Sequence, residues 1–131
     1  ISSSRAETAA AAGDGGAVIW PLLVGPARAK EFLMTGNLID AQRAERIGLI
    51  NYVVPHDKLR EEAWGFARQL ANGPSVAINT TKMSVNKMLK HLSNLVLDYS
   101  LSIEMHCFNT EDHLEAARAF VEKRAPKFKG C

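Results

Sequence analysis

The sequence has 131 residues, of which 47% are hydrophobic and 23% charged, and its formal net charge is +2. Such a composition is ordinary for a single globular domain, so it excludes an intrinsically disordered chain, and the charge is too small to indicate nucleic-acid binding. No apolar run approaches the roughly 20 residues that a membrane-spanning helix requires, and the first residues lack the apolar segment of a secretory signal. We therefore expect neither a nucleic-acid nor a membrane partner.

Cysteine and histidine usage indicates neither a metal site nor a disulfide framework. The two cysteines, Cys107 and Cys131, have no metal-ligand spacing, and this pattern is typical of a reducing cytoplasm. The histidines are scattered, and none has a partner at the spacing of a metal site or a catalytic triad. We therefore predict no bound metal.

Residues 1–12 differ in composition from the rest of the chain. They contain a serine run, a short charged stretch and consecutive alanines, without an amphipathic pattern. Alanine favours a helix but offers little surface to bury, so a loose helix, a strand and an unstructured tail all remain open here.

The stretch 13–35 carries the clearest signals for local structure. Glycines surround Asp14 at 13–16, and the apolar run that follows predicts a short buried helix that either breaks near Pro21 or continues with a kink. Pro26 is expected in the first turn of a second helix, whose apolar face is formed by Ala29, Phe32 and Leu33.

The next segment, up to residue 55, predicts a short helix and the only strand. Asp40 is expected to cap a helix over 41–47, while Gly36 and Gly48 stand where helices end. The run LINYVV at 49–54 is rich in β-branched residues and stops at Pro55, which is typical of a strand. A single strand cannot form a sheet, so this one pairs with the N-terminal segment or is the edge of a larger sheet.

From residue 57 onward the pattern is helical. Asp57 is expected to cap a helix that ends at Gly73, and a final helix begins at Thr110. Between them, from Ser75 onward, two successive helices are expected, one with the stripe from Val85 to Leu92 and one with the stripe from Leu95 to Cys107. Apolar residues recur at helical spacing and predict buried faces over this whole region: Leu59, Phe66 and Leu70, then Val85, Met88, Leu89 and Leu92, then Leu95, Tyr99, Ile103 and Cys107, and finally Leu114, Ala117 and Phe120 or Val121.

Two groups of residues are candidates for chemistry. Asp14 either caps the helix that begins near Gly15 or acts as a general acid/base at that helix start. The C-terminal group alternates aromatic and basic side chains, and it is either a solvated helix end or a binding site for an anionic ligand: Phe120, Lys123, Arg124, Lys127, Phe128 and Lys129.

Three motifs taken together closely resemble the second half of the enoyl-CoA hydratase/isomerase family, the crotonase superfamily. They are GDGGA, LVGPARAKEFLMTGNLIDAQRAERIGLINYVVP and AFVEKRAPKFKG, and the resemblance covers about residues 13–130. It implies a mainly α chain with a short β element, the C-terminal half of an α/β crotonase (ClpP/crotonase-like) fold. The expected organisation is an atypical segment 1–12, the end of the crotonase core at 13–55, and a helical oligomerisation and coenzyme A-contacting region at 56–131.

The resemblance implies an enoyl-CoA hydratase or isomerase that acts on acyl-CoA thioesters through an enolate stabilised by backbone amides. Asp14 matches an aspartate that shuttles a proton in the dienoyl-CoA isomerase branch, whereas the hydratases' catalytic glutamate is expected eight residues before Gly13, where this chain has Arg5. Phe120 and Lys123 match residues that approach coenzyme A. Coenzyme A is part of the substrate, so no separate cofactor is expected.

The family also implies a homotrimer or a dimer of trimers. Because the oxyanion donors and one glutamate belong to the other half of the fold, we expect this chain alone to be inactive. A non-catalytic helical assembly module remains the alternative of a different class.

Overall fold

The computed structural model describes residues 9–131, so the predictions for residues 1–8, Arg5 included, lie outside it. Within the described residues the elements are helices: α2 (Gly16–Val24), α3 (Pro26–Thr35), α4 (Ala41–Arg46), the 3₁₀ helix η1 (His56–Lys58), α5 (Leu59–Ala71), α6 (Ser75–Phe108) and α7 (Glu111–Glu122). None of these helices is both long and apolar enough to cross a bilayer.

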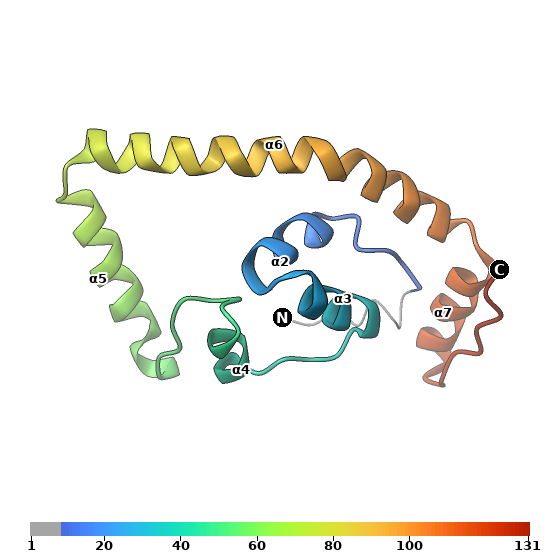
Figure 1. Cartoon of the computed structure of the whole chain (residues 1–131). Helices are drawn as coiled ribbons and strands as arrows, with labels where there is room; N and C mark the ends of the chain where they lie inside the picture. Colours follow the sequence, from blue (N-terminus) through green and yellow to red (C-terminus); the bar gives the residue numbers. More distant parts are fainter. Residues whose placement is uncertain (1–8) are drawn as a thin grey trace.

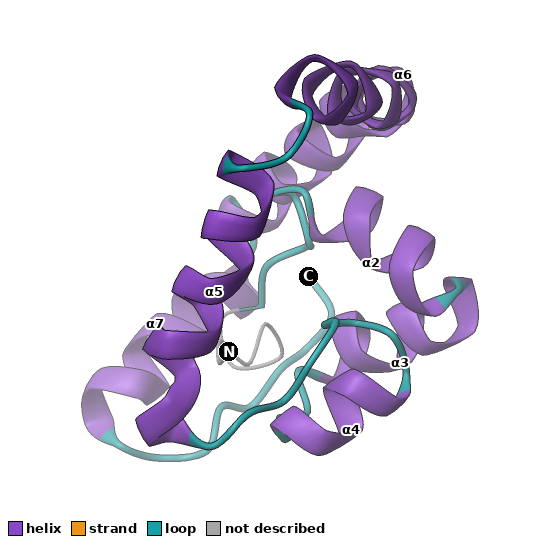
Figure 2. Ribbon diagram, turned by 90° about the vertical axis from the view of Figure 1, so that its left-hand side faces the viewer, coloured by secondary structure: helices purple, strands orange, loops and turns teal. Residues whose placement is uncertain are grey.

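The long helix α6 organises the arrangement. It runs along one edge of the molecule, α5 and α7 turn back from its two ends, and α2, α3 and α4 lie between them in Figure 1. In Figure 2, α2–α4 lie to the right of α5 and α7 and below α6. Helix α2 contacts both α3 and α6, so it joins the small helices to the long one.

A small core forms between α2 and α3. Val18, Val24, Ala29 and Phe32 are buried, as the predicted apolar face of the second helix requires. The rings of Trp20 and Phe32 lie 5.9 Å apart and are tilted at 56°, an arrangement that aromatic pairs favour. Helix α2 continues through its internal proline rather than ending there.

The predicted ends of α3 and α4 are confirmed. Gly36 ends α3 with a φ of 67°, and the Asp40 carboxylate accepts the Arg43 N–H at 2.6 Å. After α4 the chain reverses at Gly48, whose φ is 80°, and the Leu49 N–H donates to the Ala44 carbonyl at 2.9 Å. A left-handed residue at this point satisfies the last carbonyls of the helix, which explains the glycine.

The strand predicted at 49–54 is not found in the part of the chain that the structure describes. Residues 49–51 form bends and residues 52–55 are irregular, and no other described segment pairs with them. Instead, the Val53 N–H donates to Glu45 Oε1 at 2.8 Å. A strand needs a neighbouring strand for its ladder of hydrogen bonds, so β propensity alone does not produce one here.

Two predictions about helix boundaries in the second half are wrong. Helix α6 is one continuous helix rather than two, because Ser75–Phe108 contains no glycine or proline to interrupt it. Asp57 lies within η1 and does not cap α5, whose N-cap position is occupied by Lys58 without a side-chain hydrogen bond. Thr110 does cap α7, since its hydroxyl oxygen accepts the His113 N–H at 3.2 Å.

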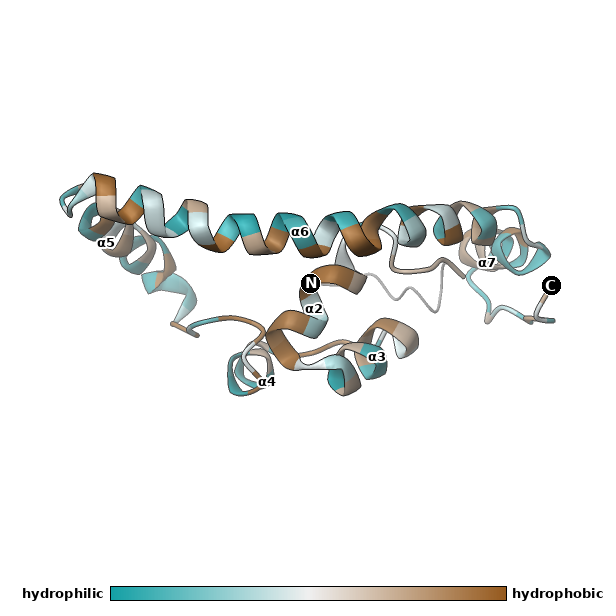
Figure 3. Ribbon diagram, turned by 45° about the horizontal axis from the view of Figure 1, so that its top comes forward, coloured by the Kyte–Doolittle hydropathy of each residue, from teal (hydrophilic) through white to brown (hydrophobic). Residues whose placement is uncertain are grey.

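Most of the predicted apolar faces are uncovered in this chain. Helix α5 has no buried residue, and in α7 the exposed fractions of Phe120 and Val121 are both 79%. The buried residues of α7 are instead Ala116 and Ala119. Figure 3 shows hydrophobic residues recurring along α5 and α6. The exposed members of the predicted faces are Leu59, Phe66, Leu70, Val85, Met88, Leu95, Tyr99, Ile103, Leu114, Phe120 and Val121.

Candidate functional site

The glycine-rich turn before α2 presents Asp14 on the surface. The Gly13 N–H donates to the Ala11 carbonyl at 2.9 Å, and Gly15, with a φ of 96°, is the N-cap of α2. The Gly15 carbonyl accepts the first bond of the helix, from the Ile19 N–H, at 3.0 Å. A φ of this sign favours glycine, so Gly15 lets the chain turn sharply between the exposed Asp14 and the helix.

The structure shows where Asp14 lies relative to the start of α2. Asp14 is not the N-cap of α2, because Gly15 occupies that position and α2 has no side-chain cap. Its Oδ1 atom lies 3.7 Å from where a Cβ on Gly16 would stand, so the carboxylate bends towards the first turn of α2. Gly15 is the N-cap residue, and both the helix-associated interpretation of Asp14 and its role in proton transfer stay predictions.

Glu104, a residue of α6, contacts this turn, and the sequence did not indicate it. It lies near the end of α6 and is half-buried, and its side chain lies directly against Gly13. The contact joins residues from opposite ends of the sequence, so neither motif nor periodicity indicated it. Arg5, which stands at the position of the hydratases' catalytic glutamate, lies outside the described residues.

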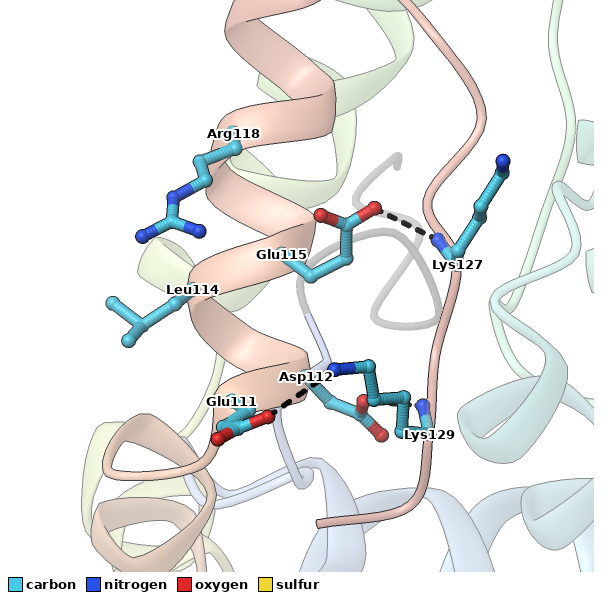
Figure 4. Close-up of a pocket in the computed structure, with 7 residues that line it drawn as sticks. All are labelled: Glu111, Asp112, Leu114, Glu115, Arg118, Lys127 and Lys129. Atoms are coloured by element: carbon cyan, nitrogen blue, oxygen red, sulfur yellow. Dashed lines mark hydrogen bonds and ion pairs between the residues drawn. The ribbon is translucent and has the colours of Figure 1, made fainter.

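The C-terminal tail, residues 125–131, is tied to one face of α7 by two carboxylates. Asp112 accepts the backbone N–H groups of Lys129 at 2.7 Å and of Gly130 at 2.8 Å. Glu115 accepts the Lys127 N–H at 2.9 Å, as Figure 4 shows. The buried residues of α7, Ala116 and Ala119, follow Asp112 at helical spacing and so share its side of the helix.

A cavity of about 290 Å³ lies between α7 and this tail. Figure 4 shows Lys127 and Lys129 on the tail side of the cavity and Arg118 with Leu114 on the opposite side of α7. The Lys129 Nζ atom lies 3.6 Å from Glu111 Oε2. The cavity is lined by three carboxylates, three basic side chains and one leucine: Glu111, Asp112, Glu115, Arg118, Lys127, Lys129 and Leu114.

Arg124 is engaged by carboxylates and is not part of an open basic patch. Its guanidinium donates to both Glu115 oxygens, at 2.5 and 3.0 Å, and to Glu122 Oε2 at 2.6 Å. The Arg124 hydrogen bond and then the Lys127 N–H lower the pKa of Glu115 from its ordinary 4.5 to about 2, while the bonds to Glu115 and Glu122 raise the pKa of Arg124. Arg124 therefore links the chain after α7 to that helix, and an anion site in this group stays a prediction.

The two predicted coenzyme A-contacting residues lie at the end of α7. Lys123 is the C-cap residue, with a left-handed φ of 53°, and its N–H donates to the Phe120 carbonyl at 3.3 Å. Both side chains are exposed. Asp14, by contrast, lies in the turn before α2 and not on α7.

Potential metal ligands do not cluster in the described part of the chain. Among residues 9–131 no group of three or more His, Cys, Asp and Glu side chains is arranged to hold a metal ion. Cys107 and Cys131 are both free thiols.

Comparison with known proteins decides the family. The family model for enoyl-CoA hydratase/isomerase matches residues 2–131, almost the whole chain. The chain belongs to the enoyl-CoA hydratase/isomerase family. Similar curated proteins include a probable enoyl-CoA hydratase of Rhizobium meliloti, which is 38% identical over 117 residues (89% of this chain and 46% of the relative). Another is the carnitinyl-CoA dehydratase of Salmonella typhi, which is 36% identical over 124 residues (88% and 46%).

Solved structures of the same family share the fold. An enoyl-CoA hydratase/isomerase from Mycobacterium paratuberculosis is 36% identical with a TM-score of 0.78, over 91% of this chain and 45% of that protein. One from Pseudoalteromonas atlantica superposes with a TM-score of 0.89 at 24% identity, over 98% and 52%. The chain thus spans about half the length of the relatives it matches, and it has the helical C-terminal half of the crotonase fold.

Proposed function

We propose that this chain supplies part of an acyl-CoA hydratase or isomerase that works through a thioester enolate. The observation that carries the proposal is the family match over residues 2–131. Relatives bear the names enoyl-CoA hydratase, crotonyl-CoA hydratase and carnitinyl-CoA dehydratase, and each name describes only that relative. Hydration and isomerisation both move protons next to the thioester while an oxyanion is held by N–H donors.

Asp14 is the residue that we assign to proton transfer. It is exposed at the turn before α2, between Gly13 and Gly15. A positioned carboxylate transfers protons to and from carbon acids, which isomerisation of an enoyl or dienoyl thioester requires. An isomerase that uses Asp14 is therefore the specific form of the activity that this chain's own residues favour.

The coenzyme A end of the substrate is assigned to Lys123 and Phe120. The lysine is exposed at the end of α7 and can make a charge-assisted contact with phosphate, while the neighbouring aromatic ring offers an apolar surface. Coenzyme A belongs to the substrate in this scheme, and no further cofactor is needed. Arg124 is left out, because its guanidinium already binds two carboxylates.

The uncovered apolar faces support assembly with further protein. Helix α5 exposes Trp64 and Phe66, at 55% and 58%, and such faces are costly to leave in water. We assign them to contacts in a homotrimer or a dimer of trimers, and the free thiols favour a cytoplasmic location. The same faces favour the second candidate function, a non-catalytic assembly module.

Turnover by the intact protein separates these two functions. We expect the intact protein to convert crotonyl-CoA or a 3-enoyl-CoA, and the 131-residue chain alone to show no turnover, because the family's oxyanion donors lie in the other half of the fold. An intact protein that assembles but converts neither thioester would favour the module. Turnover by the 131-residue chain alone, abolished by Asp14→Asn, would contradict the view that it is only part of the site.

A further inference from the structure

The turn that presents Asp14 is covered by a residue from the far end of α6. Gly13 is buried, and a Cβ atom added to it would lie 2.7 Å from Glu104 Cβ and 2.6 Å from Glu104 Cδ. Real Cβ atoms do not approach other carbon atoms so closely, so the Glu104 side chain occupies the space that any larger residue at position 13 would need. The absence of a side chain at Gly13 is what lets α6 approach the turn.

This contact fixes the backbone next to Asp14. Asp14 lies between Gly13, which Glu104 covers, and Gly15, whose φ of 96° starts α2. The Gly13 N–H is also bound to the Ala11 carbonyl at 2.9 Å. Glycine backbones are otherwise permissive, so a turn of three glycines around one aspartate needs an outside contact to hold a single conformation.

We propose that Glu104 is a positioning residue for Asp14. Its Cβ, Cδ and Oε2 atoms lie against Gly13 and hold the turn, so that the Asp14 carboxylate meets a bound thioester in a fixed orientation. The effect comes from the space that the Glu104 side chain fills, which a glutamine side chain also fills. This inference rests on the proposed role of Asp14 in proton transfer.

Substitutions of Glu104 in the intact protein test the role by turnover of crotonyl-CoA or a 3-enoyl-CoA. Glu104→Ala is expected to lower kcat by about 10- to 100-fold with little change in KM, because small misplacements of a catalytic group cost rate rather than binding. Glu104→Gln keeps the shape, so we expect a kcat within about 3-fold of the wild type. The control is Ser102→Ala, an exposed position on the same helix. A Gln variant as slow as the Ala variant, or an Ala variant as fast as the wild type, would overturn the proposal.

A double-mutant cycle tests the contact without relying on activity. Gly13→Ala is expected to lower Tm by several degrees when Glu104 is present and by much less in the Glu104→Gly background, since every side-chain atom that it meets, the Cβ included, is gone. Additive Tm shifts would overturn the inference. Non-additive shifts in a protein that converts neither thioester would overturn the proposed function, and with it the positioning role, and leave only a packing contact.

Discussion

Arg124 and Glu115 form a two-point ion pair that joins the chain after α7 to the middle of that helix. The guanidinium reaches the two carboxylate oxygens at 2.5 and 3.0 Å, and the same carboxylate accepts the Lys127 N–H at 2.9 Å. Glu115 therefore bonds both to Arg124, the residue before the tail, and to Lys127 within the tail. Paired N–H···O bonds of this kind fix geometry as well as adding attraction.

The pH dependence of stability should report this pair. The folded pKa of Glu115, about 2, lies below its ordinary value of 4.5, so its contribution is present in full above that ordinary value and is lost as the pH falls from 4.5 towards 2. We expect the Tm difference between the wild type and Glu115→Gln to be constant above about pH 5.5 and to shrink below pH 4.5.

The matched control for that series is Glu61→Gln, because Glu61 lies on the exposed surface of α5. Its Tm difference from the wild type should stay small at every pH. A Glu115→Gln difference that stays the same from pH 5.5 down to pH 2.5 would show that the ion pair does not lower the pKa of Glu115, because a lowered pKa makes this stabilisation fall as the pH drops below 4.5.

The N-cap of α4 should be measurable by a single substitution. Asp40→Ala removes the acceptor that the Arg43 N–H reaches at 2.6 Å, and we expect the free energy of unfolding to fall by about 0.5–2 kcal/mol. Asp40→Asn retains an oxygen and should cost much less. Chemical denaturation measures both, with the exposed Gln42→Ala as control. Equal losses in the Ala and Asn variants would rule out the cap.

Lys123 offers a way to separate binding from folding. Its φ of 53° is a conformation that glycine adopts without strain, so Lys123→Gly should leave Tm unchanged or raise it. The same change removes the amine, and we expect the affinity for coenzyme A to fall by about 10-fold. Calorimetric titration of the intact protein, with the exposed Lys82→Ala as control, measures this effect. Unchanged affinity in Lys123→Gly would reject Lys123 as a phosphate contact.

Local signals in the sequence predicted the local structure well. The caps at Asp40 and Thr110, the turn glycines at 36 and 48, and the buried face of α3 all depend on residues within one or two turns of each other. The continuity of α6 was not predicted, although the sequence indicates it, because no glycine or proline interrupts Ser75–Phe108.

The features that were mispredicted or missed depend on distant partners. The segment 49–54 forms no ladder without a neighbouring strand, and α7 buries Ala116 and Ala119 rather than the predicted residues. The contact between Gly13 and Glu104 joins opposite ends of the chain, so no periodicity or motif could indicate it. Of the predicted site residues, the structure places Asp14, Phe120 and Lys123 on the surface, and their roles await measurement.

Turnover of crotonyl-CoA and of a 3-enoyl-CoA by the intact protein, in the wild type and in Asp14→Asn, tests the central claim most directly. The wild type should convert one of the two thioesters, and Asp14→Asn should lower kcat by about 10²- to 10⁴-fold, as expected for loss of a proton-transfer group. Asp57→Asn, at another exposed aspartate, should retain full activity. A wild-type protein that converts neither thioester, or an Asp14→Asn variant that retains full activity, would contradict the account.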